Sequence, residues 1–329
     1  MKLHDIHVHL GGAVPAPVLW ELLKAQGLAS THKSFPEFQE ALTARPDPKK
    51  GLDGFLGKYF HISEQIQSSP EAAETSAYQA IAKIARRSGA KSVELRFNPA
   101  KRLRGQLYNI DAVIAAVVRG ITKGCDHYEM EGGAILCLGR DVSASTNETI
   151  LNAALRWKSK GVIAIDMAGP ESGREEHSSN WLSETAELFL AARLGGLRTT
   201  YHIGETAASG PEGLAKVLHH IRPDRIGHGI QLRKAKGREL ASLLGTLKDT
   251  KTCLEICPTI NRVTGSAQTR EIQNLCRLLT SAKCPFAVCT DNPYLVHTTL
   301  PREIEIATPG GNEREWAMAS AEAHRFTRG

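Results

Sequence analysis

Eight short apolar runs of strand type recur along the chain, most of them followed by a break and a longer stretch with helical periodicity. Strands that alternate with helices favour a parallel sheet, and eight such units predict a closed α/β barrel of the TIM type, (β/α)8. Reactive side chains of such barrels gather at the carboxyl ends of the strands. The expected strands are 3–8, 92–97, 134–138, 162–167, 198–201, 225–227, 252–256 and 286–289.

The first gap between expected strands, from Gly11 to about Lys91, is much longer than the others. It contains helical pieces at 17–26 and 55–67, so we expect a helical insertion at about 12–90 that covers the barrel mouth as a lid. Barrels of this kind reach 329 residues as one unit, and the chain is therefore expected to form a single domain, 1–329.

Composition narrows the class of protein. Hydrophobic residues make up 41% and charged residues 23%, as in globular proteins, and the net charge of +6 is too small and dispersed to favour nucleic-acid or membrane binding. Seven cysteines, an odd number, favour reduced thiols, and residues 1–10 carry acid and histidines where a signal peptide needs an apolar stretch. We expect a cytoplasmic protein that acts on a small molecule, as a monomer or a homo-oligomer.

Two histidines end the first expected strand. Side chains two apart in a strand face the same side, so His7 and His9 can reach one point. The pair alone is equally consistent with two polar residues at a strand end. His202 and Glu205 follow the fifth expected strand, His228 the sixth and Asp291 the eighth, so in a barrel all of them converge on one mouth.

This donor set suits a metal ion. Three neutral imidazoles and a carboxylate are typical ligands of zinc or a similar divalent ion that keeps one position open for water. The ion lowers the pKa of that water to about 7, which supplies hydroxide at neutral pH. The chemistry indicated is a hydrolytic addition to an electrophilic carbon or phosphorus.

At these residues the sequence resembles the adenosine deaminase family of the metal-dependent amidohydrolase superfamily. Seven segments match in order between residues 7 and 293 and so cover nearly the whole chain. They are HVHL (7–10), VELRF (93–97), IDMAGPE (165–171), HIGE (202–205), RIGHG (225–229), EICPTIN (255–261) and TDNP (290–293).

The resemblance implies a role for each residue of the site. One zinc ion per subunit would be held by His7, His9, His202 and Asp291. Glu205 would protonate a purine ring nitrogen while hydroxide attacks the adjacent amino-bearing carbon. The same resemblance implies that His228 orients the attacking water and that Gly169 offers its backbone N–H to another ring nitrogen.

Two departures from the family pattern concern the substrate. Gly11 stands where adenosine-specific members place an acid that holds the ribose 5′-hydroxyl, so we expect that contact to be lost and space to be gained. The nearby Lys101, Arg102 and Arg104 form either a solvated basic loop, which we favour, or a phosphate site. Asn292 replaces a second acid, and its amide suits either an ordinary purine N7 or a ring that carries N–H there.

Other polar residues are given structural roles. Glu94, Arg96 and Glu255 face the barrel interior, where buried charge must be paired, and are candidates to orient the metal ligands. Cys253 and Cys257 are expected in the core or behind the ligands, and His61, His219 and His220 on the surface or in helix packing.

The leading hypothesis is a zinc-dependent aminohydrolase of a 6-aminopurine nucleoside or derivative. A second keeps the site but changes the target to another aminated heterocycle, such as a modified or oxidised purine, a free base or a pterin; ammonia release from one of these, with none from adenosine, would favour it. A third is a binding or signalling barrel without turnover, against which the retention of all six acid–base and ligand side chains argues.

Overall fold

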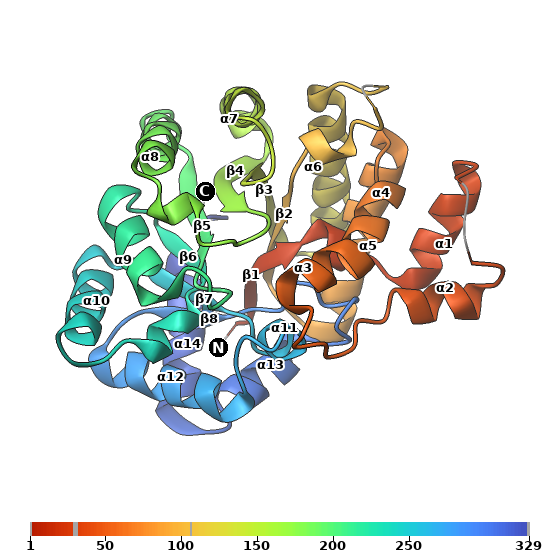
Figure 1. The fold of residues 1–329 in the computed structure, drawn as a ribbon. Coiled ribbons are helices and arrows are strands. Elements are labelled where there is room, and N and C mark those ends of the chain that lie inside the picture. The colour runs from red at the N-terminus through yellow and green to blue at the C-terminus, as the bar shows by residue number, and fades with distance from the viewer. Residues whose placement is uncertain (1, 29–31, 106, 328–329) are drawn as a thin grey trace.

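The computed structural model describes residues 2–28, 32–105 and 107–327, and it confirms the (β/α)8 barrel (Figure 1). Eight parallel strands stand side by side in chain order. They are β1 (His4–His9), β2 (Ser92–Phe97), β3 (Glu131–Gly139), β4 (Val162–Ala168), β5 (Arg198–Ile203), β6 (Arg225–His228), β7 (Cys253–Ile256) and β8 (Phe286–Val288).

The barrel closes between β8 and β1 through a residue beyond β8. Val8 and Asp291 form a parallel bridge. The amide of His9 donates to the carbonyl of Asp291 at 2.7 Å, and the amide of Asp291 donates to the carbonyl of His7 at 2.9 Å. Because the closure uses Asp291, this residue lies directly beside the two histidines of β1.

Five strands, β1, β3, β4, β5 and β6, run further at their carboxyl ends than the sequence pattern predicts, and the extensions of β5 and β6 carry site histidines. β5 continues to Ile203 and β6 to His228, because His202 pairs with Gly227 and Ile203 pairs with His228 in the ladder. His202 and His228 therefore stand within the ends of strands and not after them, and the sheet itself holds their backbones.

Helices fill the segments between the strands, in agreement with the helical periodicity that follows most of the expected strands. The helices are α1 (Ala16–Ala25), α2 (Phe35–Ala41), α3 (Gly51–Phe55), α4 (His61–Ile66), α5 (Pro70–Ser88), α6 (Ile110–Tyr128), α7 (Ala144–Trp157), α8 (Ser179–Leu194), α9 (Gly210–His220), α10 (Gly237–Thr250), α11 (Pro258–Val263), α12 (Thr269–Ala282), α13 (Leu300–Ala307) and α14 (Gly311–His324). Within the described ranges no helix has both the length and the apolar character of a membrane span.

The long segment between β1 and β2 contains two kinds of helix. α5 packs against α6 in the ring around the barrel, whereas α1 and α2 project to one side (Figure 1). α3, the π-helical turn η2 (Leu56–Phe60) and α4 follow one another without a break and line the cavity at the barrel mouth. Of the insertion expected at about 12–90, these three elements are the part that lines the cavity.

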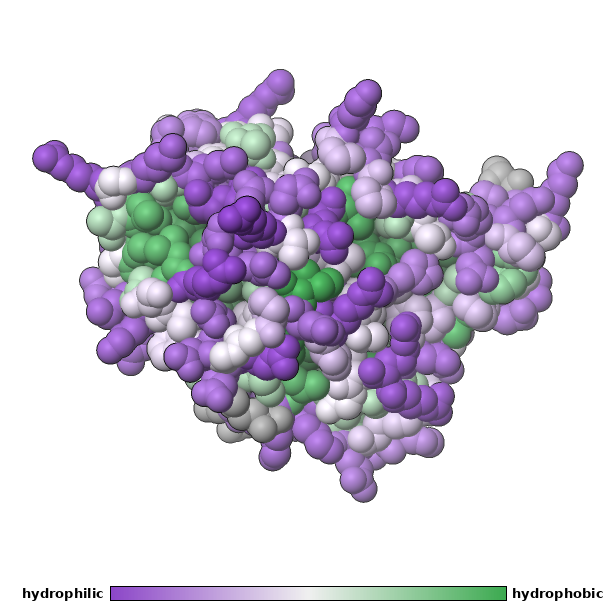
Figure 2. Space-filling view, turned by 90° about the horizontal axis from the view of Figure 1, so that it is seen from below, coloured by the Kyte–Doolittle hydropathy of each residue, from purple (hydrophilic) through white to green (hydrophobic). Residues whose placement is uncertain are grey.

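The apolar residues gather inside. One core cluster of buried side chains extends through the chain from Ile6 to Ala321. The face seen in Figure 2 is mostly hydrophilic, with apolar side chains visible in patches between polar ones. All seven cysteines are buried and free.

The contact between α5 and α6 yields a stability prediction. A Cβ on Gly120 of α6 would lie 2.3 Å from the carbonyl oxygen of Glu74 in α5. Gly120→Ala is therefore expected to force the helices apart and to lower the free energy of unfolding by about 1–3 kcal/mol. Gly245→Ala in α10, where a Cβ meets nothing within 4 Å, is expected to raise it by about 0.5–1 kcal/mol. Urea unfolding of both variants checks the opposite signs; a shift of the same sign in both would contradict the tight packing.

Candidate active site and metal centre

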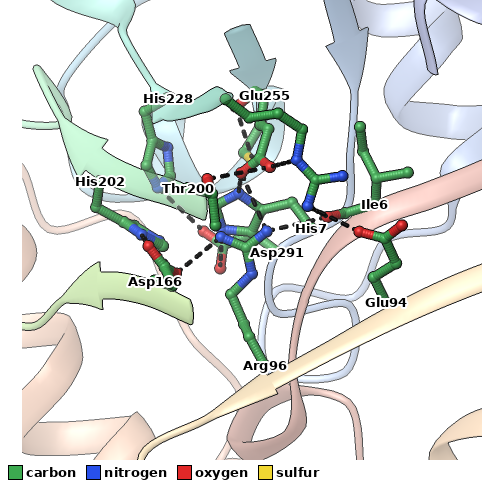
Figure 3. Close-up of polar contacts among 12 residues, drawn as sticks. Ile6, His7, Glu94, Arg96, Asp166, Thr200, His202, His228, Glu255 and Asp291 are labelled. Atoms are coloured by element: carbon green, nitrogen blue, oxygen red, sulfur yellow. Dashed lines mark hydrogen bonds and ion pairs between the residues drawn. The ribbon is translucent and has the colours of Figure 1, made fainter. Parts of the chain in front are cut away.

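Side chains from four strand ends meet at the barrel mouth. His7 and His9 come from β1, His202 from β5, His228 from β6, and Asp291 from the closure beyond β8. Figure 3 shows His7, His202, His228 and Asp291 gathered together. The Nε2 atoms of His9 and His202 are 3.1 Å apart. Asp291 Oδ1 lies 3.7 Å from His7 Nε2 and 3.5 Å from His9 Nε2.

The arrangement of these atoms fits a divalent cation. The ligand atoms of His7, His9 and His202 lie within 4.8 Å of one another. His7 Nε2 is buried and has no hydrogen-bond partner among the described residues. Burial, with help from neighbouring positive groups, holds the pKa of all three imidazoles well below the usual value, so they are neutral and keep a lone pair for a metal.

A buried ionic network orients the ligands from behind (Figure 3). The Nδ1 atom of His7 lies 2.6 Å from Glu255, and that of His202 lies 3.0 Å from Asp166. Arg96 joins the two carboxylates by donating to Asp166 at 2.9 Å and to Glu255 at 3.0 Å. Each imidazole therefore carries its proton on Nδ1 and turns Nε2 to the cluster, as in metal sites in general.

The expected role of Glu94 needs a correction. Glu94 does not contact a ligand; it pairs with Arg225 at 2.7 Å and accepts from the amides of Phe326 and Thr327 near the end of the chain. Arg225 in turn forms an ion pair with Glu255 at 2.6 Å, so Glu94 acts one step further away.

Sequence reasoning missed the roles of Asp166 and Arg225. Both lie on expected strands, and a charged residue in an otherwise apolar strand was the signal that could have found them.

Glu205 and His228 stand together beside the cluster. Glu205 Oε2 lies 3.6 Å from His228 Nε2, and both side chains are buried. Burial, then the nearby Asp291 and Glu171, raises the pKa of Glu205 well above its usual range, which favours the protonated carboxyl that can donate.

Two neighbours position this pair. Asn261 Nδ2 is 3.3 Å from His228 Nδ1, and because an amide nitrogen can only donate, the ring proton of neutral His228 lies on Nε2. The Glu171 carboxylate accepts from the backbone amides of Glu205 and Thr206 at 3.0 and 3.1 Å and so holds the loop after β5.

A cavity of about 220 Å³ opens over these groups. Its walls include Gly169 and Asn292, in the places expected for substrate contacts. Asn292 donates one N–H of its amide to Asp291 Oδ1 at 2.6 Å, and its own Oδ1 has no hydrogen-bond partner among the described residues. Cys257 is buried beside His7, His228 and Asp291, and burial raises its thiol pKa well above 9, so it packs as a neutral group.

The expectation of extra space beside Gly11 was wrong. A Cβ on Gly11 would lie only 2.6 Å from the ring of Phe60, which fills that place from η2 and meets His9 edge to face with ring centroids 5.8 Å apart. The sequence did not predict this contact, because Phe60 lies about fifty residues from Gly11 in the chain and the fold of the insertion brings the two together.

The basic loop after β2 also differs from expectation. Arg102 is fully buried and lies 3.5 Å from Glu64, so it is not a solvated residue. Arg104 donates to Gln26, and Lys101 pairs with Asp141 at 2.6 Å on the cavity wall.

His61, His219 and His220 lie on helices, as expected. His61 is exposed on α4 but also lines the cavity, while His219 and His220 are exposed at the end of α9.

Comparison with known proteins agrees with this geometry. The family model described as "Adenosine deaminase" matches residues 3–326. The chain belongs to the adenosine deaminase family. An adenosine deaminase of Clostridium kluyveri is 29% identical over 301 residues, which are 91% of this chain and 81% of that protein. As a member of this family the chain is a hydrolytic deaminase acting on purine C–N bonds.

Solved structures share the fold. An adenine deaminase from Arthrobacter aurescens superposes with a TM-score of 0.82 at 15% identity and covers 98% of this chain and 93% of its own. A Burkholderia ambifaria amidohydrolase with bound zinc also has a TM-score of 0.82, at 17% identity, covering 99% of this chain and 86% of its own.

The network behind the ligands makes a testable prediction. Asp166→Asn removes the charge that orients His202 and is expected to weaken zinc affinity by about 10- to 100-fold. Competition with a chelator measures the affinity. Asp111→Asn, which removes a carboxylate from an exposed pair with Arg156, is the matched control and should leave the affinity unchanged. Equal affinity of Asp166→Asn and the wild type would contradict the positioning role.

Proposed function

We propose that the protein binds one zinc ion through His7, His9, His202 and Asp291 and hydrolytically deaminates a 6-aminopurine nucleoside or derivative. The observation that carries the proposal is that the imidazole–carboxylate cluster and Glu205, whose pKa burial raises, meet at one cavity. The same donors suit iron or manganese.

The charge balance around the cluster supports a dication. The network holds three carboxylates, Glu94, Asp166 and Glu255, against two guanidinium groups. Burial raises the pKa of Asp291 to about 8, and a bound cation favours the carboxylate form of this residue. Buried charges are tolerated when they are paired, so a bound dication compensates the excess negative charge. When bound, zinc supplies a water that ionises near neutral pH.

The side chains of this protein account for the remaining steps. The Glu205 carboxyl donates its proton to the ring nitrogen next to the amino-bearing carbon, which makes that carbon electrophilic. The Nε2–H of His228, near both Glu205 and Asp291, orients the attacking water and stabilises developing negative charge. The backbone N–H of Gly169 holds another ring nitrogen, and Leu56 and Phe60 give the cavity wall apolar surface against which the purine ring packs.

A second candidate follows from Asn292. Its Oδ1 has no hydrogen-bond partner among the described residues, and an acceptor at this place suits a ring bearing N–H at the imidazole edge. A modified or oxidised purine meets this requirement, and the same cluster and Glu205 would act on it.

A substrate panel tests the proposed activity. Zinc-loaded protein is expected to release ammonia from at least one of adenine, adenosine, deoxyadenosine, AMP, 5′-thio-adenosines and N6-methylated analogues, with a change in the purine absorbance band. Turnover of an oxidised adenine or a pterin, with none of the panel, would support the second candidate. No ammonia from any compound, with zinc bound, would contradict the proposal.

Glu205→Gln separates proton donation from metal binding. Loss of general acid catalysis is expected to lower kcat by about 100-fold or more, with zinc content unchanged. Glu184→Gln, at an exposed position of α8, controls for loss of a carboxyl and should retain full activity. Parallel loss of zinc and activity in Glu205→Gln would instead make Glu205 a metal ligand.

A further inference from the structure

A second group of polar side chains lines the same cavity. These residues follow other strands than those that carry the candidate metal ligands. Asn98 and Lys101 follow β2, and Asp141 follows β3. The proposed mechanism uses none of these three residues. Many of their neighbours in the cavity wall, such as Leu138 and Ala168, are apolar.

Asn98 presents an unused hydrogen-bond donor. Its side chain lies in the cavity wall and the residue is 7% exposed. The Oδ1 atom accepts from the amide of Lys101 at 3.1 Å, which fixes the orientation of the amide group because only the oxygen can accept. The Nδ2 atom then faces away from that amide and has no hydrogen-bond partner among the described residues. A buried donor of this kind costs free energy until a ligand or water accepts from it.

Asp141 places an acceptor close to this donor. A Cβ on Gly139 would lie 3.0 Å from Asp141 Oδ1 and 3.3 Å from Asn98 Nδ2, so both atoms border the same small space. A Cβ on Gly169 would lie 3.1 Å from the same Asp141 oxygen. A hydroxyl group both donates and accepts, and it therefore matches this pair of atoms.

The charges at this wall favour an uncharged group. Lys101 Nζ lies 2.6 Å from Asp141 Oδ2, so the ammonium is already neutralised. Arg102 is directed to Glu64, and Arg104 to Gln26. None of these three cations is left unpaired to bind a phosphate group.

We propose that Asn98 and Asp141, with Lys101 holding Asp141 in place, form a subsite that binds the ribose ring hydroxyls of an uncharged purine nucleoside. The inference rests on the proposed function, in which the Gly169 N–H binds a ring nitrogen of the purine. We take this to be the ring nitrogen closest to the bond between the base and the sugar. The substituent nearest to that nitrogen is the sugar at the adjacent position, and Asp141 lies beside Gly169. The sugar is thus bound by the loops after β2 and β3, since Phe60 occupies the space beside Gly11.

A substrate pair that differs only in these hydroxyls tests the subsite. The test compares kcat/KM for adenosine with kcat/KM for 2′,3′-dideoxyadenosine. A hydrogen bond to a charged group leads us to expect that the wild type prefers adenosine by about 10- to 100-fold. Asp141→Asn and Asn98→Asp are expected to reduce this preference by about fivefold or more, mainly through KM for adenosine. Asp111→Asn, which breaks an exposed ion pair elsewhere, should keep the preference.

Other outcomes overturn the proposal. An equal loss for both substrates in Asp141→Asn would show a structural role only. A preference for AMP over adenosine that disappears in Lys101→Gln would make this wall a phosphate site.

Binding distinguishes failure of the subsite from failure of the proposed function. Absence of turnover for every aminopurine rejects the function. The affinities of zinc-loaded Glu205→Gln for adenosine and dideoxyadenosine, measured by calorimetry, then judge the subsite separately. A tighter binding of adenosine that is lost on adding Asp141→Asn supports the subsite, and equal affinities overturn it.

Discussion

The arrangement of the site depends on one buried interaction, the contact of Arg96 with both Asp166 and Glu255. Taking these charges out of water is costly, and the cost is offset only when every charge finds its partner in good geometry. Here each carboxylate also contacts a histidine, His202 for Asp166 and His7 for Glu255. The pairing that allows charge inside the barrel therefore also sets the proton position and ring orientation of two candidate ligands.

The closure of the barrel is linked to the same cluster. Asp291 bridges Val8 through its backbone and turns its carboxylate to His7 and His9. Its φ of 59° and that of His228, 64°, lie in the left-handed region, which non-glycine residues rarely adopt. Backbone strain of this kind persists where surrounding structure imposes it and concentrates at functional sites. The parallel ladder and the closing hydrogen bonds supply that constraint.

The two ends of the cavity are built from different kinds of structure. The end with the candidate metal ligands is built by strands, whose spacing is fixed by the hydrogen bonds of the sheet. The substrate end is built by loops and by the insertion, in which η2 brings Phe60 against Gly11 and α4 brings Glu64 to Arg102. Glycine at position 11 consequently does not enlarge the cavity, and the polar contacts available to a substituent come from the loops after β2 and β3.

The amino-acid sequence alone determined the eight strand and helix units and the six side chains at the barrel mouth. Alternating strands and helices leave a local pattern of apolar residues in the sequence. Parallel strands of a barrel bring their carboxyl ends to one rim. Position relative to the expected strands was therefore enough to place these side chains at the mouth: His7, His9, His202, Glu205, His228 and Asp291. Only the tertiary structure decided that Phe60 fills the place beside Gly11, that Arg102 is buried, and that Glu94 forms an ion pair with Arg225. These outcomes depend on contacts between residues that lie far apart in the chain. Such contacts follow from packing and charge pairing in three dimensions, and no periodic pattern in the sequence indicates them.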